Sequence, residues 1–237
     1  MLSLKKYPSM QDISPREYMY FPKGVLEEGK PGEFSSRELL ELGLAIIVLT
    51  FSFSLSISQN NVFWGFNNLN NFFEAVPISF FGIISAFFVH ELMHKFMAQK
   101  YGLWSEFRSY SKGLVFSFLL SLFTPLVFAA PGAVMFQGET RIYEQGKIAS
   151  AGPGANVVIA GVTLPLYMFF LFESGFVGRI VSMVCMVNGL LATFNLLPFN
   201  PLDGRKVLRW NGLVWAVLFI AAVVITLNIV PRVVFEI

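Results

Sequence analysis

Five stretches of the chain are apolar over enough residues to cross the hydrocarbon core of a bilayer. Each is close to the roughly 20 apolar residues that a transmembrane helix needs. They cover residues 39–58, 76–97, 148–172, 179–198 and 212–230. A sixth stretch, residues 113–130, is long enough but is interrupted by Pro125 and followed by a segment of small residues. The pattern predicts an all-α polytopic membrane protein with five to six transmembrane helices.

Lysine and arginine concentrate in alternate connecting segments, and cytosolic loops are the ones that carry them. They are present in 1–38, 95–112 and 199–211 and absent from 59–75 and 173–178. The basic segments, including the N-terminus, are therefore expected in the cytosol. This topology requires residues 113–147 to leave the cytosolic side and return to it, as a re-entrant segment or a tight hairpin. A sixth full crossing is the alternative.

Composition supports the membrane class, since 55% of the 237 residues are hydrophobic and 14% are charged, against about 25% charged in an ordinary soluble domain. The net charge of +2 is too small to indicate a nucleic-acid partner. The single cysteine, Cys185, lies in an apolar stretch, which leaves no disulfide framework. Residues 1–38 are expected to form a polar cytosolic tail, and residues 39–237 a single transmembrane domain.

The two histidines of the chain both lie in the sequence HELMH, inside the predicted span 76–97. Residues four apart share one face of a helix, so His90 and His94 can bind one metal ion, as the H-E-x-x-H pattern does in zinc proteases. Glu91, about 100° around the helix, is near enough to reach a metal-bound water. Two histidines bonded to neighbouring helices would be the simpler account, but ionisable residues inside a span are costly and usually functional.

Catalytic zinc usually has three protein ligands and one open position. Without a third histidine, the third ligand must be a carboxylate or Cys185. Asp203 stands out, because Pro198 and Pro201 break the helix before it, and irregular backbone at membrane depth is tolerated where it lines a polar cavity. HELMH and this segment also lie near the cytosolic ends of spans that run in the same direction, so their depths match. An aspartate that caps an ordinary turn is the alternative.

Two further motifs accompany H-E-x-x-H in a fixed order. They are a G-P-x-x-N element at Gly152, Pro153 and Asn156, and an N-x-x-P-x-x-P-x-D-G-like stretch at Asn195, Pro198, Pro201, Asp203 and Gly204. The three motifs together resemble the site-2 protease family of intramembrane zinc metalloproteases, over residues of about 76–210. Segments 103–108 and 128–134 look like those of the compact archaeal members, with Leu103 in place of a cysteine.

The resemblance implies one Zn²⁺ per chain, bound by His90, His94 and Asp203, with Glu91 as the general base. It also implies a multi-pass protein whose partners are the lipid bilayer and membrane-protein substrates, which such enzymes cleave within or beside their transmembrane segments. The active site is expected near the cytosolic side.

Other residues of the motifs have two interpretations each. The Asn195 amide can donate to a substrate carbonyl or oxyanion, or form an interhelical hydrogen bond. Asn156 either faces the site, where it is expected to bind substrate, or caps a helix, and Asn188 is interpreted as structural. The small residues at 149–155 favour close helix packing.

A short strand is expected next to the active site, because a helical substrate must unwind before its carbonyls can react. The run AVMF favours a strand and is bounded by proline and glycine. Its edge can pair with an unwound substrate by β-augmentation. The residues concerned are Ala133, Val134, Met135 and Phe136. An amphipathic connector is the alternative.

Two other functions are compatible with these features. A non-catalytic homologue that binds membrane helices would not need the Glu91 base. A metal or ion transporter would also place histidine and aspartate within its spans, but transporters often show repeated halves, and this sequence shows none.

Overall fold

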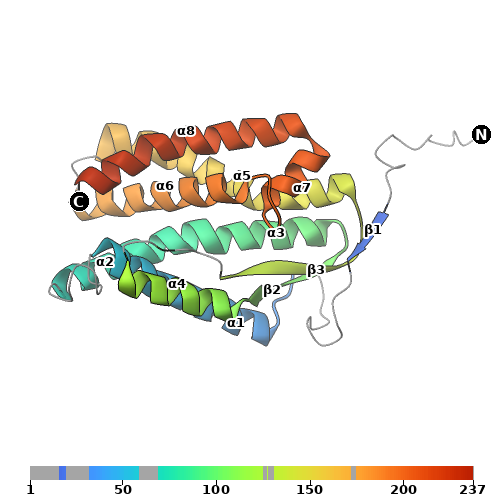
Figure 1. Cartoon of the computed structure of the whole chain (residues 1–237), viewed down its shortest axis with the longest axis horizontal. Coiled ribbons are helices and arrows are strands. Elements are labelled where there is room, and N and C mark those ends of the chain that lie inside the picture. The colour runs from blue at the N-terminus through green and yellow to red at the C-terminus, as the bar shows by residue number, and fades with distance from the viewer. Residues whose placement is uncertain are drawn as a thin grey trace, which may run out of the picture.

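A computed structural model describes residues 16–19, 32–58, 69–124, 127, 131–171 and 175–236 (Figure 1). The helices are α1 Ser36–Ile57, α2 Leu69–Ile83, α3 Val89–Lys100, α4 Ser111–Phe123, α5 Ile142–Leu166, α6 Gly175–Asn195, α7 Asp203–Trp210 and α8 Gly212–Glu236. Two π-helical turns, η2 Ile84–Phe88 and η3 Tyr167–Leu171, continue α2 into α3 and extend α5. The strands are β1 Arg16–Met19, β2 Trp104–Ser109 and β3 Gly132–Arg141.

Five helical segments of the described chain are long and apolar enough to span a membrane, which confirms the predicted class. They are Ser36–Ile57, Leu69–Lys100, Ile142–Phe169, Gly175–Asn195 and Gly212–Pro231. The helix α4 has 13 residues, which is about 20 Å of helix against a hydrocarbon core of about 30 Å. It packs along α1, and the chain then comes back as β3 (Figure 1). The stretch considered as a sixth crossing thus contains a helix that is shorter than the spanning helices, and the strand β3 follows it.

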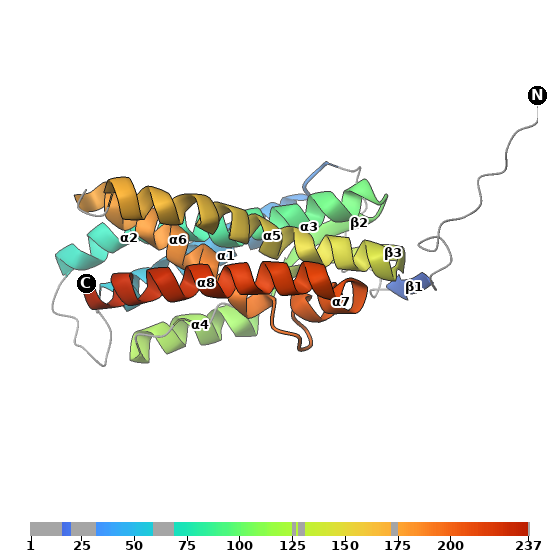
Figure 2. The ribbon, with the colours of Figure 1, turned by 90° about the horizontal axis from the view of Figure 1, so that it is seen from above.

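The helices form two groups around the long Leu69–Lys100 helix. On one side lie α1 and α4, and on the other α5, α6 and α8 (Figures 1 and 2). The small helix α7 packs against α5 and α8 at the same end of the bundle as the sheet. On α8, apolar side chains on the outer face are exposed at Leu213, Val217, Ile220, Val224 and Leu227. This spacing of three to four residues gives the helix one continuous apolar face, as lipid contact requires.

The sheet lies at one end of the bundle and has the order β1-β3-β2, with both pairings antiparallel. The strand expected at 133–136 is part of β3. On one edge, β3 pairs with β2 along Gly132–Gln137; on the other edge, β1 pairs with Gly138–Arg141. Over 132–137, the outer edge of β3 pairs with no strand in the described residues.

The start of α1 differs from the predicted tail of residues 1–38. The helix begins at Ser36, because the Ser35 side chain accepts a hydrogen bond from the Glu38 backbone N–H (3.1 Å) and caps it. Glu38 is fully buried against the side chain of Lys95. The last residues of the segment predicted as a polar cytosolic tail are thus part of α1, and Glu38 belongs to the protein core.

Candidate metal centre and catalytic site

Two helices bring three ligand atoms together near the cytosolic ends predicted for their spans. His90 and His94 lie one turn apart on α3, and Asp203 is the first residue of α7. The two Nε2 atoms are 2.9 Å apart, and Asp203 Oδ2 lies 3.0 Å from Nε2 of His94 and 3.5 Å from that of His90. Among the described residues, this is the cluster of histidine, cysteine and acidic side chains that could hold a metal ion.

The separations suit a tetrahedral zinc ion. Ligand atoms about 2.0–2.1 Å from such an ion lie about 3.4 Å from one another. The three measured separations, 2.9, 3.0 and 3.5 Å, therefore need changes of only a few tenths of an ångström. Three protein ligands leave a fourth position for water, as in catalytic zinc sites.

Hydrogen bonds on the far side of each imidazole decide which nitrogen faces the metal position. Nδ1 of His94 lies 2.8 Å from the carbonyl oxygen of Ile148, which can only accept, so Nδ1 carries the proton. Nδ1 of His90 lies 2.5 Å from Oδ1 of Asn156, and the same reasoning applies. In the neutral rings, both Nε2 atoms are then bare lone pairs that converge with a carboxylate oxygen. Such a group needs a cation among its members, and zinc supplies one.

Asp203 is held as a carboxylate. Its Oδ2 faces the imidazoles, and its Oδ1 lies 3.7 Å from Nζ of Lys206. The charge of Lys206 favours the ionised form of this carboxyl group. A carboxylate is the form that binds a metal.

Gly152 of α5 borders the metal position. A Cβ built on this residue would overlap Nε2 of His94 and lie 2.7 Å from Nε2 of His90. The small residues at 149–155 were predicted to permit helix packing. The structure adds that the glycine leaves free the space toward which the ligand atoms point.

Two other glycines allow α7 to pack closely against its neighbours. A Cβ on Gly146 would overlap the Trp210 side chain, and a Cβ on Gly204 would overlap the carbonyl of Leu196 at the end of α6. The turn before α7 is also bound by the indole N–H of Trp215, which donates to the Leu196 carbonyl (2.7 Å). These close contacts fix the helix whose first residue is Asp203.

Glu91 lies between the metal ligands and the sheet. It is buried, and its Oε2 accepts a hydrogen bond from the backbone N–H of Val134 (3.0 Å). The proposed base is thus one residue from a ligand and in contact with the strand expected beside the site.

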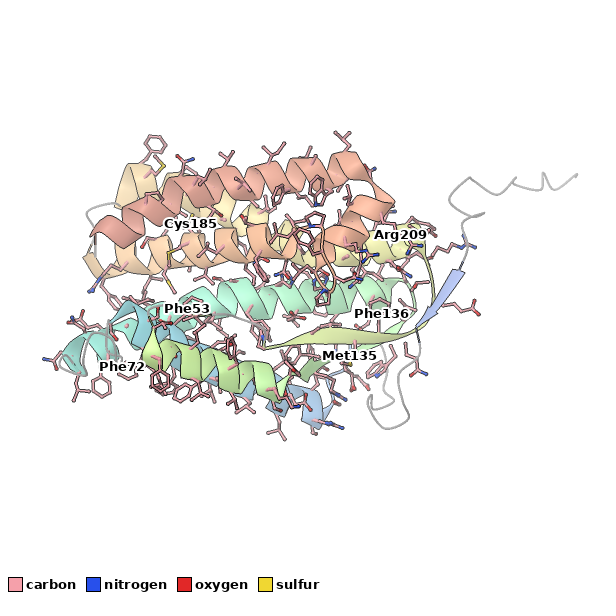
Figure 3. The ribbon with its side chains drawn as sticks, viewed as in Figure 1. Phe53, Phe72, Met135, Phe136, Cys185 and Arg209 are labelled. Carbon is pink, nitrogen blue, oxygen red and sulfur yellow. The ribbon has the colours of Figure 1, made fainter. Side chains whose placement is uncertain are left out.

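The predicted catalytic residue Asn195 and the predicted substrate-binding strand lie on different elements and differ in burial. Asn195 ends α6, half-buried, and donates to the Leu191 carbonyl of its own helix (3.1 Å). In β3, Ala133 is exposed, Val134 and Met135 are half-buried, and Phe136 is buried. Figure 3 shows Phe136 on the side of this strand that faces α3 and Met135 on the other side.

Asn156 and Cys185 are both fully buried in the bundle. Asn156 is fully buried behind His90, and its amide is hydrogen-bonded on both sides, so the substrate-binding role predicted for it does not fit this position. Cys185 is fully buried and far from Arg209 of α7 (Figure 3). The carboxylate, rather than the cysteine, is therefore the third ligand that the geometry supports.

Two buried polar residues near the site, Asn188 and Lys95, are indicated in the sequence by their positions within apolar spans. Asn188 contacts Asn156, and it is a polar residue in an apolar span, which is usually functional. Lys95 follows Glu91 by four residues, on the same face of α3, and is buried against Glu38.

A helical membrane bundle with two histidines, an aspartate and an adjacent buried glutamate defines the class of zinc metalloproteases. Two similar proteins from Methanocaldococcus jannaschii carry names of the same class. The protein named "Putative zinc metalloprotease MJ0611" is 38% identical over 190 residues, which cover 78% of this chain and 90% of the relative. "Zinc metalloprotease MJ0392" is 26% identical over 167 residues, which cover 69% of this chain and 39% of that relative.

No family model and no solved structure matches the chain. The extent of the first similarity, together with the motifs, shows that the chain belongs to the site-2 protease family as a compact archaeal-type zinc metalloprotease. Zinc is its cofactor.

Proposed function

We propose that this metalloprotease hydrolyses peptide bonds in or next to the transmembrane segments of membrane-protein substrates. The observation that carries the proposal is the position of Glu91, which lies on a membrane-spanning helix beside two metal ligands and also touches the strand β3. The site thus combines the groups for hydrolysis with a backbone edge for an unwound chain.

The roles of the residues follow from their positions. His90, His94 and Asp203 hold zinc, which when bound polarises the scissile carbonyl and acidifies a water molecule. Glu91 accepts the proton of that water and passes it to the leaving amine. Asn195 follows one turn after Leu191, and its amide donates to the oxyanion once it leaves the Leu191 carbonyl.

One edge of the sheet is closed to a substrate. The outward backbone N–H of Phe107 donates to Oε1 of Glu38 (2.9 Å), and that of Ser109 donates to Oε2 of Glu41 (2.7 Å). The two glutamates lie on one face of α1, three residues apart, and the two N–H groups lie on one edge of β2. The carboxylates therefore occupy the positions where a further strand would pair.

The outer edge of β3 is the one that supports substrate pairing. Phe107 and Val134 are cross-strand partners. The N–H of each points away from the partner strand, that of Phe107 to Glu38 and that of Val134 to Glu91. Because backbone groups alternate in direction, Phe136 also presents its N–H and C=O on this outer edge. An extended substrate that pairs there runs directly past Glu91. From Gly138 onward, β1 occupies the same edge and limits the length of the pairing.

Replacing Glu91 by glutamine tests the proposed reaction. Glutamine keeps the size and an acceptor for Val134 but cannot take the proton, so cleavage of a transmembrane substrate should fall by about 10² to 10⁴ while zinc content is unchanged. Glu74→Gln, the same change at an exposed position of α2, is the matched control and should cleave normally. Near wild-type cleavage by Glu91→Gln would refute the mechanism and favour a transporter. A zinc-loaded wild type that binds but never cleaves membrane substrates would indicate a non-catalytic homologue.

We also propose that the N-terminus and the metal centre face the cytosol. The sheet and α7 lie at one end of the bundle, and the exposed basic residue Arg205 belongs to α7. In a Cys185→Ser background, Arg205→Cys should react with a membrane-impermeant thiol reagent only from the cytosolic side. Asn70→Cys, exposed at the start of α2, should react only from outside. Labelling of Arg205→Cys from outside would overturn this orientation.

A further inference from the structure

A chain of polar side chains runs through the interior of the bundle and ends at a metal ligand. Nδ2 of Asn188 donates to Oγ of Ser85 (3.1 Å), Nδ2 of Asn156 donates to Oδ1 of Asn188 (2.8 Å), and Oδ1 of Asn156 faces Nδ1 of His90 (2.5 Å). Asn156 and Asn188 are fully buried. Four elements contribute, namely η2, α6, α5 and α3. The turn η2 is π-helical, and such turns are frequent at functional sites.

Backbone carbonyls at two points fix the direction of every bond in this chain. Nδ2 of Asn188 also donates to the carbonyl of Val184 (2.8 Å), and Nδ2 of Asn156 also donates to that of Ala86 (3.0 Å). Carbonyls only accept, so turning either amide around would place two oxygens against each other. Asn188 thus presents its oxygen to Asn156, and Asn156 presents its own oxygen to His90.

We propose that Asn188 is a positioning residue for the metal centre, acting through Asn156 to keep the His90 proton on Nδ1. A neutral imidazole has one N–H, so a proton on Nδ1 leaves Nε2 free to bind zinc. If the Asn156 amide turned around, its NH₂ group would face Nδ1, which would then have to accept. The proton would move to Nε2, and His90 would cease to be a ligand.

Asn188 is the side chain that opposes this rotation, together with the backbone carbonyl of Ala86. It accepts one of the two Asn156 amide hydrogens, and Ala86 accepts the other. The second histidine is held differently, since Nδ1 of His94 is fixed by the backbone carbonyl of Ile148, which cannot rotate. His90 alone of the two depends on a side-chain amide, so the effect of Asn188 should be confined to His90. The inference rests on the zinc centre of the proposed function and not on the nature of the substrate.

The first test is zinc affinity, measured by competition with a chelator on purified full-length protein without substrate. Asn188→Leu removes the acceptor for Asn156, and zinc affinity should fall by about 10- to 100-fold, as is typical when a partner of a ligand is lost. Asn188→Asp, which burial keeps as the neutral acid, offers a carbonyl oxygen to Asn156 and an O–H to Val184, and should retain most of the affinity. Asn228→Leu is the matched control on α8, where an exposed asparagine is bonded only to its own helix in the described structure, and it should bind zinc normally.

The second test reads the proton directly. The chain has two histidines, so nitrogen-15 labelling of histidine gives the ring signals of this site alone. In the zinc-free protein at alkaline pH, the wild type should show Nδ1–H on both rings. Asn188→Leu should shift one ring toward Nε2–H, and a further His94→Gln substitution assigns that ring to His90.

The outcomes separate a positioning role from a structural one. A folded Asn188→Leu protein with wild-type zinc affinity, or with weaker zinc binding but an unchanged His90 tautomer, would overturn the proposal. Should Asn188→Leu fail to fold, Asn188→Ala decides, because it removes the same acceptor for Asn156 without a bulky replacement. It should weaken zinc binding and move the same ring signal, and an unchanged signal would again refute the idea. Since no cleavage is measured, failure here is distinct from failure of the proposed reaction.

Discussion

Replacing Gly152 by alanine adds one carbon at the position where the structure leaves room for the metal. The new Cβ would overlap Nε2 of His94 and lie 2.7 Å from Nε2 and 2.8 Å from Cδ2 of His90. Carbon atoms pack at about 3.5 Å or more, so the closest ring carbon is about 0.7 Å too near. Either α5 moves away from α3 or the imidazoles turn out of the site.

Gly152→Ala should affect the stability of the fold less than it affects zinc binding. Overpacking by one methyl group typically costs about 1–3 kcal/mol, against a total stability of about 5–15 kcal/mol for a domain. Zinc sites, in contrast, tolerate deviations of only about 0.2 Å in ligand distances. The Gly152→Ala protein should therefore fold but bind little zinc.

Gly154→Ala is a matched control within the same helix. A Cβ on Gly154 would meet nothing within 4 Å, and alanine is favoured over glycine in helices by up to about 1 kcal/mol. This variant should bind one zinc per chain and be at least as stable as the wild type.

Two measurements check the prediction. Elemental analysis gives zinc per chain, and thermal unfolding with and without added zinc shows whether zinc binds the folded state, since a ligand that binds only that state raises Tm. Wild type and Gly154→Ala should show the zinc-dependent rise, and Gly152→Ala should not. One zinc per chain in Gly152→Ala, with the wild-type rise in Tm, would show that the metal does not occupy the space beside this glycine.

Two further predictions concern the third ligand and the buried ion pair. Asp203→Ala should lose most zinc, and stoichiometric zinc in the purified variant would show that another residue is the third ligand. Lys95→Met should destabilise the protein by about 3–5 kcal/mol, because it leaves the fully buried carboxylate of Glu38 without its cation. The double variant Lys95→Met/Glu38→Gln should recover most of this loss in a denaturation assay, since glutamine still accepts from Phe107, and a double variant as unstable as the single one would contradict the reasoning.

Periodicity and length were enough to predict the spans and the two ligands on α3. Spans are set by the thickness of the bilayer, and the i, i+4 spacing of His90 and His94 fixes a shared face whatever surrounds it. The strand β3 was also predictable, because the run AVMF lies between proline and glycine. These features depend on local sequence alone.

The rest of the site depends on contacts between distant segments. Asp203 reaches the histidines only because the glycines at 146 and 204 let α7 approach α5 and the end of α6. Periodicity places Asn188 two turns before Asn195 on α6, but not its contact with Asn156. Glu38 appeared to be the end of a polar tail, because its partners come from α3 and β2.

The surroundings of three buried glutamates separate structural carboxylates from a reactive one. Glu38 is paired with Lys95, and Glu106 with Arg108, so each buried charge is neutralised by a cation. Glu91 is also buried. It forms no ion pair with lysine or arginine within the described part of the chain, and it accepts a hydrogen bond from the backbone of Val134. A carboxylate fixed by a cation resists protonation, whereas one held by an uncharged N–H can take up a proton and give it back. A general base must do both within each catalytic cycle. The distribution of basic side chains around the sheet therefore leaves Glu91 as the buried glutamate suited to proton transfer, beside the edge of β3 that we propose for substrate pairing.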